Sequence, residues 1–199
     1  MSVEFSRAVS KVETLLLPPE IETTAYPVLI MMSGLPGSGK SYLSQRLAEK
    51  LAAVIIESDR VRKALFSPPS YSAQESAMVH RVCHEIIRRL LRKGAHVIFD
   101  ATNLFEFHRE MLYNLADRSG AKLVIVRTTA PEQIIRERLE QRKKDGGSVS
   151  DADWHIYRRM AKREQAIRRT HLCVDTSDNI DEAVHKILKV IRRCRARSR

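Results

Sequence analysis

The chain has 199 residues, which is enough for one well-packed α/β domain and too few for two ordinary ones. Its hydrophobic content of 43% is normal for a globular protein, and its longest apolar runs are far shorter than a membrane span. The formal net charge of +11 suits polyanionic partners such as nucleic acid, nucleotides or a phosphorylated substrate, although a solvated basic surface gives the same charge.

Residues 1–26 are expected to form an N-terminal extension, with a short helical pattern over 3–17 that ends at the sequence LPPE. This end carries acidic residues and has no apolar core of signal-peptide length, which favours an untargeted protein. The three cysteines, Cys83, Cys173 and Cys194, are widely spaced and form no C-x-x-C pair. That usage fits a reducing compartment, so we expect a soluble cytoplasmic protein with no membrane association.

Five apolar runs after the extension predict buried strands, because each is continuous and rich in valine and isoleucine. Amphipathic stretches separate them, and this regular alternation predicts a parallel sheet with helices on both faces. We therefore expect a three-layer α/β fold with a five-stranded parallel sheet, formed by a single domain over residues 27–199. The predicted strands are residues 28–33, 53–58, 96–101, 122–128 and 171–176.

Three of the predicted helices have recognisable starting signals. Ser72 followed by Glu75 forms a capping box that opens a long helix to about Lys93, and Gly94 ends it. Pro131 lies in the first turn of the helix predicted over 131–144. The polar residues 150–153 are expected to start a further helix that runs to residue 167.

A phosphate-binding loop follows the first predicted strand, because GLPGSGKS fits the pattern G-x-x-x-x-G-K-[ST] at the start of a helix. Glycines let backbone N–H groups surround phosphates, Lys40 reaches the β- and γ-phosphates, and Ser41 offers an oxygen ligand to Mg²⁺. A purely structural glycine turn does not require lysine and serine at this offset. The predicted nucleotide-binding residues are Gly34, Leu35, Pro36, Gly37, Ser38, Gly39, Lys40 and Ser41.

Several classes of nucleotide-binding protein do not match the rest of the sequence. A GTPase would show N-K-x-D, which is absent, and the D-x-x-G at 117–120 closes a predicted helix instead of following a strand. A motor of the AAA+ type would have a strand ending in Asp-Glu, whereas the third strand here ends FDAT. A kinase of small molecules or nucleic acid remains.

Polar residues at two strand ends are candidates for binding the phosphoryl acceptor, since open α/β sheets bind ligands at their carboxyl edge. Asp59 follows the second strand, with Arg62 one helical turn further on, and Asp100 ends the third strand. Asp59 could alternatively be only a helix N-cap, and Asp100 only a turn residue. Asn103 is a further substrate-binding candidate, although turns favour asparagine, like Thr102 beside it, in any case.

In order along the chain, GLPGSGKS, SDRVRKALF, DATNL and RERLEQRKKDGGSVSDADW resemble the ATP-dependent kinases of the AAA_33 P-loop group. That group is similar to the kinase domain of polynucleotide 5′-hydroxyl kinases and, more remotely, to gluconate and chloramphenicol kinases. The resemblance covers roughly residues 28–190. It implies that Asp59 is the general base toward the acceptor hydroxyl, that Arg62 contacts an anionic acceptor, and that Asp100 supports the acceptor or the Mg²⁺ shell.

Residues of about 138–153 are expected to form a helical lid, because a basic helix runs into KKDGGSV, where two glycines permit bending. Arg138 and Arg142 share one helix face, and resemblance to the R-L-x-x-R lid start of nucleoside-monophosphate-type kinases makes both candidate catalytic cations. Arg136 faces elsewhere and is expected to be solvated. A solvated basic helix without catalytic arginines is the alternative.

The sequence thus predicts a kinase that uses ATP and Mg²⁺, with Lys40, Asp59, Arg138 and Arg142 as catalytic residues. The choice of ATP over GTP rests on the resemblance. A nucleic-acid 5′-hydroxyl is the favoured acceptor, because of Asp59-x-x-Arg62 and the net charge, and a small hydroxylated metabolite or antibiotic is the alternative. A hypothesis of another class is a non-catalytic, ATP-dependent switch or binding protein. No specific protein partner is evident.

Overall fold

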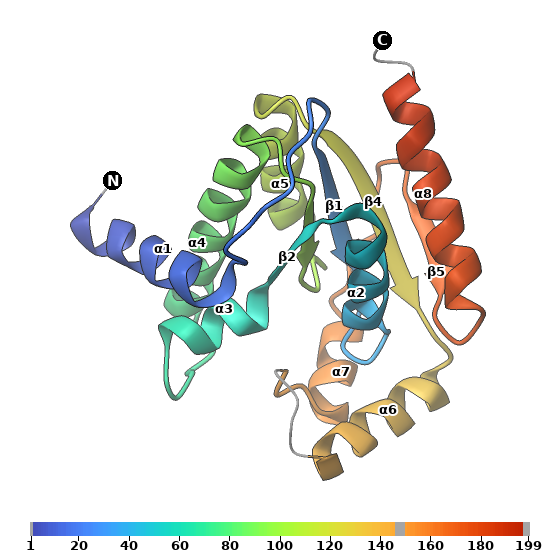
Figure 1. The fold of residues 1–199 in the computed structure, drawn as a ribbon. Coiled ribbons are helices and arrows are strands. Elements are labelled where there is room, and N and C mark those ends of the chain that lie inside the picture. The colour runs from blue at the N-terminus through green and yellow to red at the C-terminus, as the bar shows by residue number, and fades with distance from the viewer. Residues whose placement is uncertain (1, 146–149, 197–199) are drawn as a thin grey trace.

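A computed structural model describes residues 2–145 and 150–196, in which five strands form one parallel sheet in the order β2-β3-β1-β4-β5 (Figure 1). The five predicted strands are confirmed to within a residue or so at each end, except that Ser58 already begins a helix. The strands are β1 (Val28–Ser33), β2 (Val54–Glu57), β3 (Val97–Asp100), β4 (Lys122–Thr129) and β5 (Leu172–Asp175).

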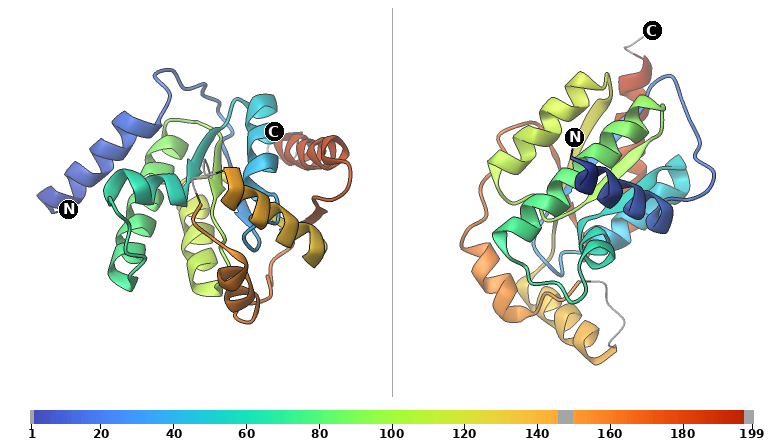
Figure 2. Two further views of the ribbon diagram at one scale, coloured as in Figure 1. Left: turned by 90° about the horizontal axis from the view of Figure 1, so that it is seen from below. Right: turned by 90° about the vertical axis from the view of Figure 1, so that its left-hand side faces the viewer.

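Eight helices surround this sheet in the described part of the chain. Apolar residues of α4 and α5 cover one face of the sheet, with α1 packed on α3 and α4, and those of α2 and α8 cover the other face, whereas α6 and α7 pack on each other near the phosphate loop (Figure 2). None of the helices in the described ranges is both long and apolar enough for a membrane span. The helices are α1 (Val3–Leu16), α2 (Lys40–Leu51), α3 (Ser58–Leu65), α4 (Ala73–Arg92), α5 (Glu106–Arg118), α6 (Glu132–Asp145), α7 (Trp154–Ala161) and α8 (Ile180–Ala196).

The central strand β1 is buried along its whole length. Met31 is paired with Phe99 of β3 on one side and with Ile125 of β4 on the other. Glu57 at the end of β2 lies in register with Asp100 at the end of β3. Because all strands are parallel, their carboxyl ends share one edge of the sheet, and this edge brings the polar strand ends together.

The N-terminal extension packs against the rest of the chain. Phe5, Val9 and Val12 of α1 are buried in the same apolar cluster as α4 and one face of the sheet. The segment after α1 is held by a hydrogen bond from the Thr24 N–H to the Gly94 carbonyl at 2.8 Å. Helix α1 and the segment after it therefore share the hydrophobic core of the rest of the chain in addition to preceding it in sequence.

The capping box predicted for α4 is confirmed in one of its two halves. The Ser72 hydroxyl accepts a hydrogen bond from the Glu75 N–H at 3.2 Å, and the helix begins directly after Ser72. The Glu75 carboxylate, however, accepts from the N–H of Ser70 at 2.7 Å and from the N–H of Tyr71 at 3.3 Å. It also faces Arg62, so this side chain joins the start of α4 to α3.

The helix predicted to reach residue 167 is wrong in its length, because α7 ends at Ala161. The following segment makes tertiary hydrogen bonds in place of helical ones. The Gln165 N–H donates to the Leu104 carbonyl at 3.0 Å, and the Ala166 carbonyl accepts from the Arg109 guanidinium at 2.8 Å. These contacts satisfy backbone groups that a longer helix would have used internally.

Candidate active site

The phosphate-binding loop lies between β1 and α2, as the sequence predicts, and two of its glycines have no room for a side chain. Gly34 has φ +146°, and a Cβ there would lie 2.6 Å from the Thr128 carbonyl oxygen. Gly39 has φ +80°, and a Cβ there would lie 2.7 Å from the Thr176 hydroxyl. The loop ends at Lys40, the first residue of α2, so the positive end of that helix faces it.

Lys40 is buried at the mouth of this loop. Its ammonium donates hydrogen bonds to the carbonyl of Gly34 at 2.9 Å and to that of Leu35 at 3.0 Å. Burial lowers the pKa of Lys40, and the negative charges of Asp100 and Asp59 oppose this shift. The lysine is thus held by the loop, within electrostatic reach of two carboxylates, where it can meet the phosphates of a bound nucleotide.

Two threonines that the sequence analysis did not single out brace the loop from the sheet side. The Ser38 hydroxyl lies 2.7 Å from the Thr128 hydroxyl, and the Ser38 carbonyl accepts from the Thr176 hydroxyl at 3.0 Å. Thr128 belongs to the end of β4, and Thr176 follows the end of β5. Their position at the carboxyl ends of predicted strands is the signal that could have identified them.

The two acceptor-side carboxylates lie near Lys40 at the same edge of the sheet. Asp100 is buried, and its Oδ2 makes no hydrogen bond with any described residue. Burial raises the pKa of Asp100, while Lys40 and a hydrogen bond from Ser41 oppose the shift. Asp59 is half-buried in the first turn of α3, where Glu57 occupies the N-cap position, so the alternative of Asp59 as the N-cap is wrong.

Ser41 and Asp100 offer a suitable pair of oxygen donors for Mg²⁺. The side chain of Ser41 lies within hydrogen-bonding reach of Asp100, which brings a hydroxyl and a carboxylate together beside Lys40. Magnesium prefers such hard oxygen ligands and is held in nucleotide sites through a few protein groups together with phosphate oxygens. The unpaired Oδ2 of Asp100 leaves an acceptor atom free for the ion or its water shell.

Arg62 lies in α3 as predicted, but its charge is already matched within the protein. It is buried and forms an ion pair with Glu75, and its second terminal nitrogen donates to the Ser76 hydroxyl at 3.2 Å. Its guanidinium also lies 4.8 Å from the centre of the Tyr71 ring. Contact between Arg62 and an anionic acceptor therefore stays a prediction that requires the guanidinium to serve both Glu75 and the acceptor.

Asn103 lies at the same edge but points into the protein. Its side-chain amide donates to the Met32 carbonyl at 2.7 Å, and its own carbonyl accepts from Ser33 and Arg109. Its φ of +45° is a left-handed conformation that asparagine tolerates better than most residues. These contacts hold the ends of β1 and β3 in place, and a direct contact of Asn103 with substrate stays a prediction.

The lid arginines both lie on α6, and they differ in what they contact. Arg138 donates to the Thr176 hydroxyl at 2.8 Å and to the Thr176 carbonyl at 2.9 Å, and it approaches the Gly37 carbonyl at 3.4 Å. The positive charge of Arg142 lies close enough to lower the pKa of Lys40, and it also opposes the rise in the pKa of Asp100. Arg136 is exposed and pairs with Glu140, as expected for a solvated position. Residues 146–149 of the predicted lid lie outside the described residues.

The C-terminal part of the predicted lid is tied to the acceptor side. Asp151 accepts hydrogen bonds from the Tyr71 hydroxyl and from the Lys63 ammonium, the latter at 3.0 Å. These two contacts lower the pKa of the Asp151 carboxyl. Because Tyr71 also lies against Arg62, one chain of contacts joins the lid region to α3 and to the start of α4. No sequence pattern indicates this connection, since its members are far apart along the chain.

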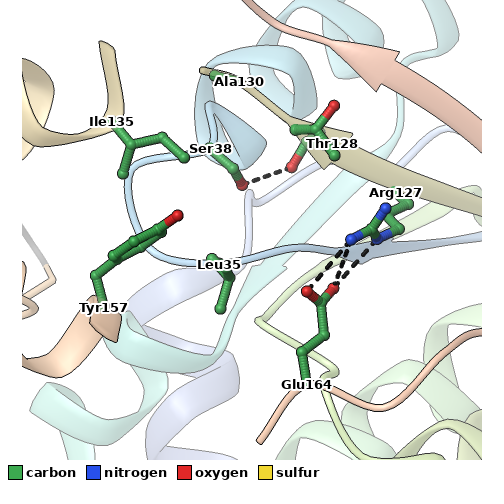
Figure 3. A pocket seen from close by; sticks show the side chains of 9 residues that line it. Leu35, Ser38, Arg127, Thr128, Ala130, Ile135, Tyr157 and Glu164 are labelled. Atoms are coloured by element: carbon green, nitrogen blue, oxygen red, sulfur yellow. Dashed lines mark hydrogen bonds and ion pairs between the residues drawn. The ribbon is translucent and has the colours of Figure 1, made fainter. Parts of the chain in front are cut away.

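A cavity of about 190 Å³ lies between the phosphate loop, the end of β4 and the helices α6 and α7 (Figure 3). Leu35 and Ser38 line it from the loop, and Ile135 and Tyr157 line it from α6 and α7. An ion pair crosses its border, in which Arg127 Nε donates to Glu164 at 3.1 Å. The helices α6 and α7 therefore pack against the outer side of the phosphate-binding loop.

Known proteins resemble this chain in both sequence and fold. It is 24% identical over 190 residues to 6-phosphofructo-2-kinase/fructose-2,6-bisphosphatase 4 of Rattus norvegicus, covering 85% of this chain and 39% of that protein. It is 25% identical over 171 residues to L-seryl-tRNA(Sec) kinase of Methanococcus maripaludis, covering 82% of this chain and 66% of that one. The chain thus spans less than two thirds of either relative.

Among solved structures, the APS kinase CysC of Mycobacterium tuberculosis, in complex with AMPPNP and APS, matches with a TM-score of 0.64. The two are 19% identical, and the match covers 85% of this chain and 99% of the other. This likeness shows the shared α/β P-loop kinase fold. Residues 29–188 match the sequence model of AAA_33, which is described as an AAA domain. The chain therefore belongs to the AAA_33 family.

Proposed function

We propose that this protein is an ATP-dependent kinase that transfers the γ-phosphoryl group to a hydroxyl acceptor. The observation that carries the proposal is the meeting of donor and acceptor groups at one edge of the sheet. The charges of Asp100 and Asp59, which come from two neighbouring strand ends, both act on Lys40 of the phosphate-binding loop. A non-catalytic switch would need the loop, but it would not need two carboxylates beside it.

In the proposed reaction, the oxygen of the acceptor hydroxyl bonds to the γ-phosphorus, and the Asp59 carboxylate takes the proton that this hydroxyl loses. The bond from that phosphorus to the β–γ bridging oxygen breaks, and ADP leaves with the electron pair. Lys40, Arg138 and Arg142 neutralise charge on the transferring group and the leaving phosphates. Mg²⁺, held by Ser41 and supported by Asp100, would supply further charge neutralisation at the phosphate oxygens.

The acceptor that we favour is a nucleic-acid 5′-hydroxyl. Support comes from Asp59-x-x-Arg62 and from the net charge of +11. A small hydroxylated metabolite is the second candidate, because one relative is named as a kinase of a phosphofructose and because Glu75 already neutralises Arg62. An acceptor whose negative charges lie away from Arg62 fits that ion pair better than one that places an anion against the guanidinium.

The test is γ-phosphoryl transfer from labelled Mg·ATP to a panel of acceptors. The panel holds DNA and RNA oligonucleotides with a free 5′-hydroxyl, the same oligonucleotides already phosphorylated at the 5′ end, and hydroxylated metabolites such as gluconate. We expect label on the 5′-hydroxyl strands only. Label on a metabolite alone would replace the favoured acceptor by the second one. Bound ATP with no labelled acceptor of any kind would contradict the kinase proposal and favour the switch.

A further inference from the structure

The segment from residue 158 to residue 171, which we name the basic strap, leads from α7 to β5. It contains one acidic residue, Glu164, which pairs with Arg127 of β4. Its six cationic side chains are exposed, and none of them forms an ion pair with a described residue. They are Arg158, Arg159, Lys162, Arg163, Arg168 and Arg169. Uncompensated charge at this density is the electrostatic footprint of a polyanion-binding surface.

The basic strap is fixed against the side of α5. Near its middle, the Gln165 side chain accepts from the Glu106 N–H at 2.7 Å, and the Ala166 carbonyl accepts from Arg109 at 2.8 Å. Further along, the guanidinium of Arg169 lies 4.1 Å from the centre of the Tyr113 ring. In the right-hand view of Figure 2 the strap runs along the side of the molecule from α7 past α5. The backbone that carries the six cations is therefore held in place along α5.

Aromatic side chains stand beside the basic strap. Phe107 in the first turn of α5 is 70% exposed, and its ring centre lies 5.6 Å from that of His108. Phe105 is half-buried, and Arg163 of the strap lies 5.4 Å from the centre of its ring. Phe107 directly follows Glu106, whose N–H is bonded to Gln165 of the strap, so its exposed ring offers a flat apolar surface one residue away from a strap contact. Single-stranded nucleic acid needs this combination, because its bases stack on aromatic rings while its phosphates meet cations.

The basic strap also leads to the candidate active site. The Gln165 N–H donates to the carbonyl of Leu104, which lies four residues after Asp100. The strap begins in α7, whose Tyr157 packs with Ile135 and Leu139 of the lid helix α6. A strand bound along one half of the strap, with its end at Gln165, would therefore have that end close to the edge of the sheet where Lys40 and Asp100 lie.

We propose that the basic strap, together with Phe105 and Phe107, binds single-stranded nucleic acid and directs its end toward the active site. This inference deepens the proposed function and rests on it only for what happens at the end of the strand. Acidic protein segments would also meet the cations, but they would not make use of the exposed ring of Phe107. An anionic membrane would take up both, but a single exposed phenylalanine buries little of the apolar area on which membrane binding depends. Duplex nucleic acid would reach the cations but would keep its bases stacked away from that ring.

Binding is measured without ATP, by fluorescence anisotropy of a labelled 12-nucleotide single strand across a series of salt concentrations. The strap variant is Lys162→Glu with Arg168→Glu, and the control is Lys11→Glu with Lys50→Glu, which makes the same charge change at exposed sites on α1 and α2. We expect the strap variant to lose affinity for the single strand. The slope of the logarithm of its binding constant against the logarithm of the salt concentration should fall in magnitude by about 1.4, because each of the two lost phosphate contacts contributes about 0.7. Equal binding by the two variants would overturn the proposal.

The aromatic contribution is tested with Phe107→Ala against Leu15→Ala, a comparably exposed apolar residue on α1. We expect Phe107→Ala to weaken single-strand binding by about tenfold, and Leu15→Ala to leave it unchanged. A duplex of the same sequence, a polyglutamate peptide and phosphatidylserine vesicles serve as competing probes, and we expect each to bind more weakly. Equal binding of any of them, with no effect of Phe107→Ala, would overturn the assignment to single strands.

The binding measurement and the transfer assay test two different proposals, and each result can contradict one without the other. Strand binding that depends on the strap, without any label at the 5′ end, would support the strap as a binding surface and contradict the nucleic-acid acceptor. Label on 5′-hydroxyl strands that is unaffected by the strap variant would keep the acceptor and contradict the strap.

Discussion

The buried Arg62 guanidinium forms an ion pair that bears on stability, and it is also predicted to contact the acceptor. Substitutions can separate these two roles. Arg62 and Glu75 are both buried and face each other, so removing either one leaves the other without its counter-charge. An unpaired buried charge destabilises a protein strongly, whereas replacing both partners by apolar residues is often nearly neutral. The pair therefore lends itself to a double-mutant cycle.

We expect Arg62→Leu alone to lower the urea midpoint of unfolding, and Arg62→Leu with Glu75→Leu to recover only part of the loss, because Glu75 also accepts hydrogen bonds from the N–H groups of Ser70 and Tyr71. The same double variant should keep a raised KM for the acceptor if Arg62 also contacts it, because leucine cannot bind an anion. Recovery of both stability and KM in the double variant would limit Arg62 to a structural role. Midpoints and KM values measured on the same preparations distinguish the two outcomes.

The Glu75 carboxylate also predicts a pH dependence of stability. Burial tends to raise its pKa, but hydrogen bonds from Ser70, Arg62 and Tyr71 outweigh burial and lower the pKa to about 2. Because the folded-state pKa lies below the ordinary value of 4.5, ionised Glu75 stabilises the fold fully above that pH. The contribution is lost as the pH falls from there toward 2.

We therefore expect the stability difference between the unmodified protein and Glu75→Gln to be largest near neutral pH and to shrink below about pH 4.5. Urea midpoints measured from about pH 7 down to about pH 3, a range that includes the ordinary titration of a glutamate, provide the measurement. Glu110→Gln, at an exposed site on α5, is the control and should show no such trend. A difference that grows on acidification would contradict the assigned direction of the shift.

At the scale of elements, Arg138 links the lid helix to the phosphate-binding loop. Its guanidinium joins α6 to Thr176, which also holds the Ser38 carbonyl of the loop. We expect Arg138→Met to weaken ATP binding, measured by titration calorimetry, and to reduce amide protection in α6, measured by hydrogen exchange. Arg136→Met, on the exposed side of the same helix, is the control and should leave both unchanged. Equal effects of the two substitutions would argue for a general destabilisation of α6.

Elements that depend on local sequence could be predicted, and those that depend on distant partners could not. The strands and the phosphate-binding loop are marked by continuous apolar runs and by closely spaced glycine, lysine and serine. The end of α7 at Ala161 is set by hydrogen bonds to Leu104 and Arg109, more than fifty residues away. No local pattern marks such a competition, and the sequence therefore predicted too long a helix.

The candidate site divides in the same way. Lys40 was identified by the pattern of the phosphate-binding loop, and Asp59 and Asp100 were identified because they lie at the ends of predicted strands, at the ligand-binding edge. The ion pair of Arg62 with Glu75 joins two helices, and Glu75 was recognised only as part of a capping box. Residue spacing predicts the position of Arg62 on its helix, but it could not show which charge the guanidinium would meet.

At the scale of the whole molecule, the N-terminal extension is expected to contribute to stability, because α1 packs into the main core. Val9 is completely buried and Val3 is 70% exposed on the same helix. We expect Val9→Ala to cost roughly 2 kcal/mol of unfolding free energy, from about 0.8 kcal/mol per lost methylene plus a cavity. Val3→Ala should cost much less. Similar unfolding midpoints for the two variants would show that α1 is not part of the folded core.

The central claim is that Asp59 acts on the acceptor at the edge where Lys40 holds the donor. It is tested most directly by kcat for phosphoryl transfer, to whichever panel acceptor is labelled, with Asp59→Asn and with Asp117→Asn as the exposed control. We predict that Asp59→Asn lowers kcat by about 10²–10⁴-fold with ATP affinity unchanged, as expected for loss of a general base, and that Asp117→Asn has no effect. Equal kcat values for the two variants would contradict the assignment of Asp59.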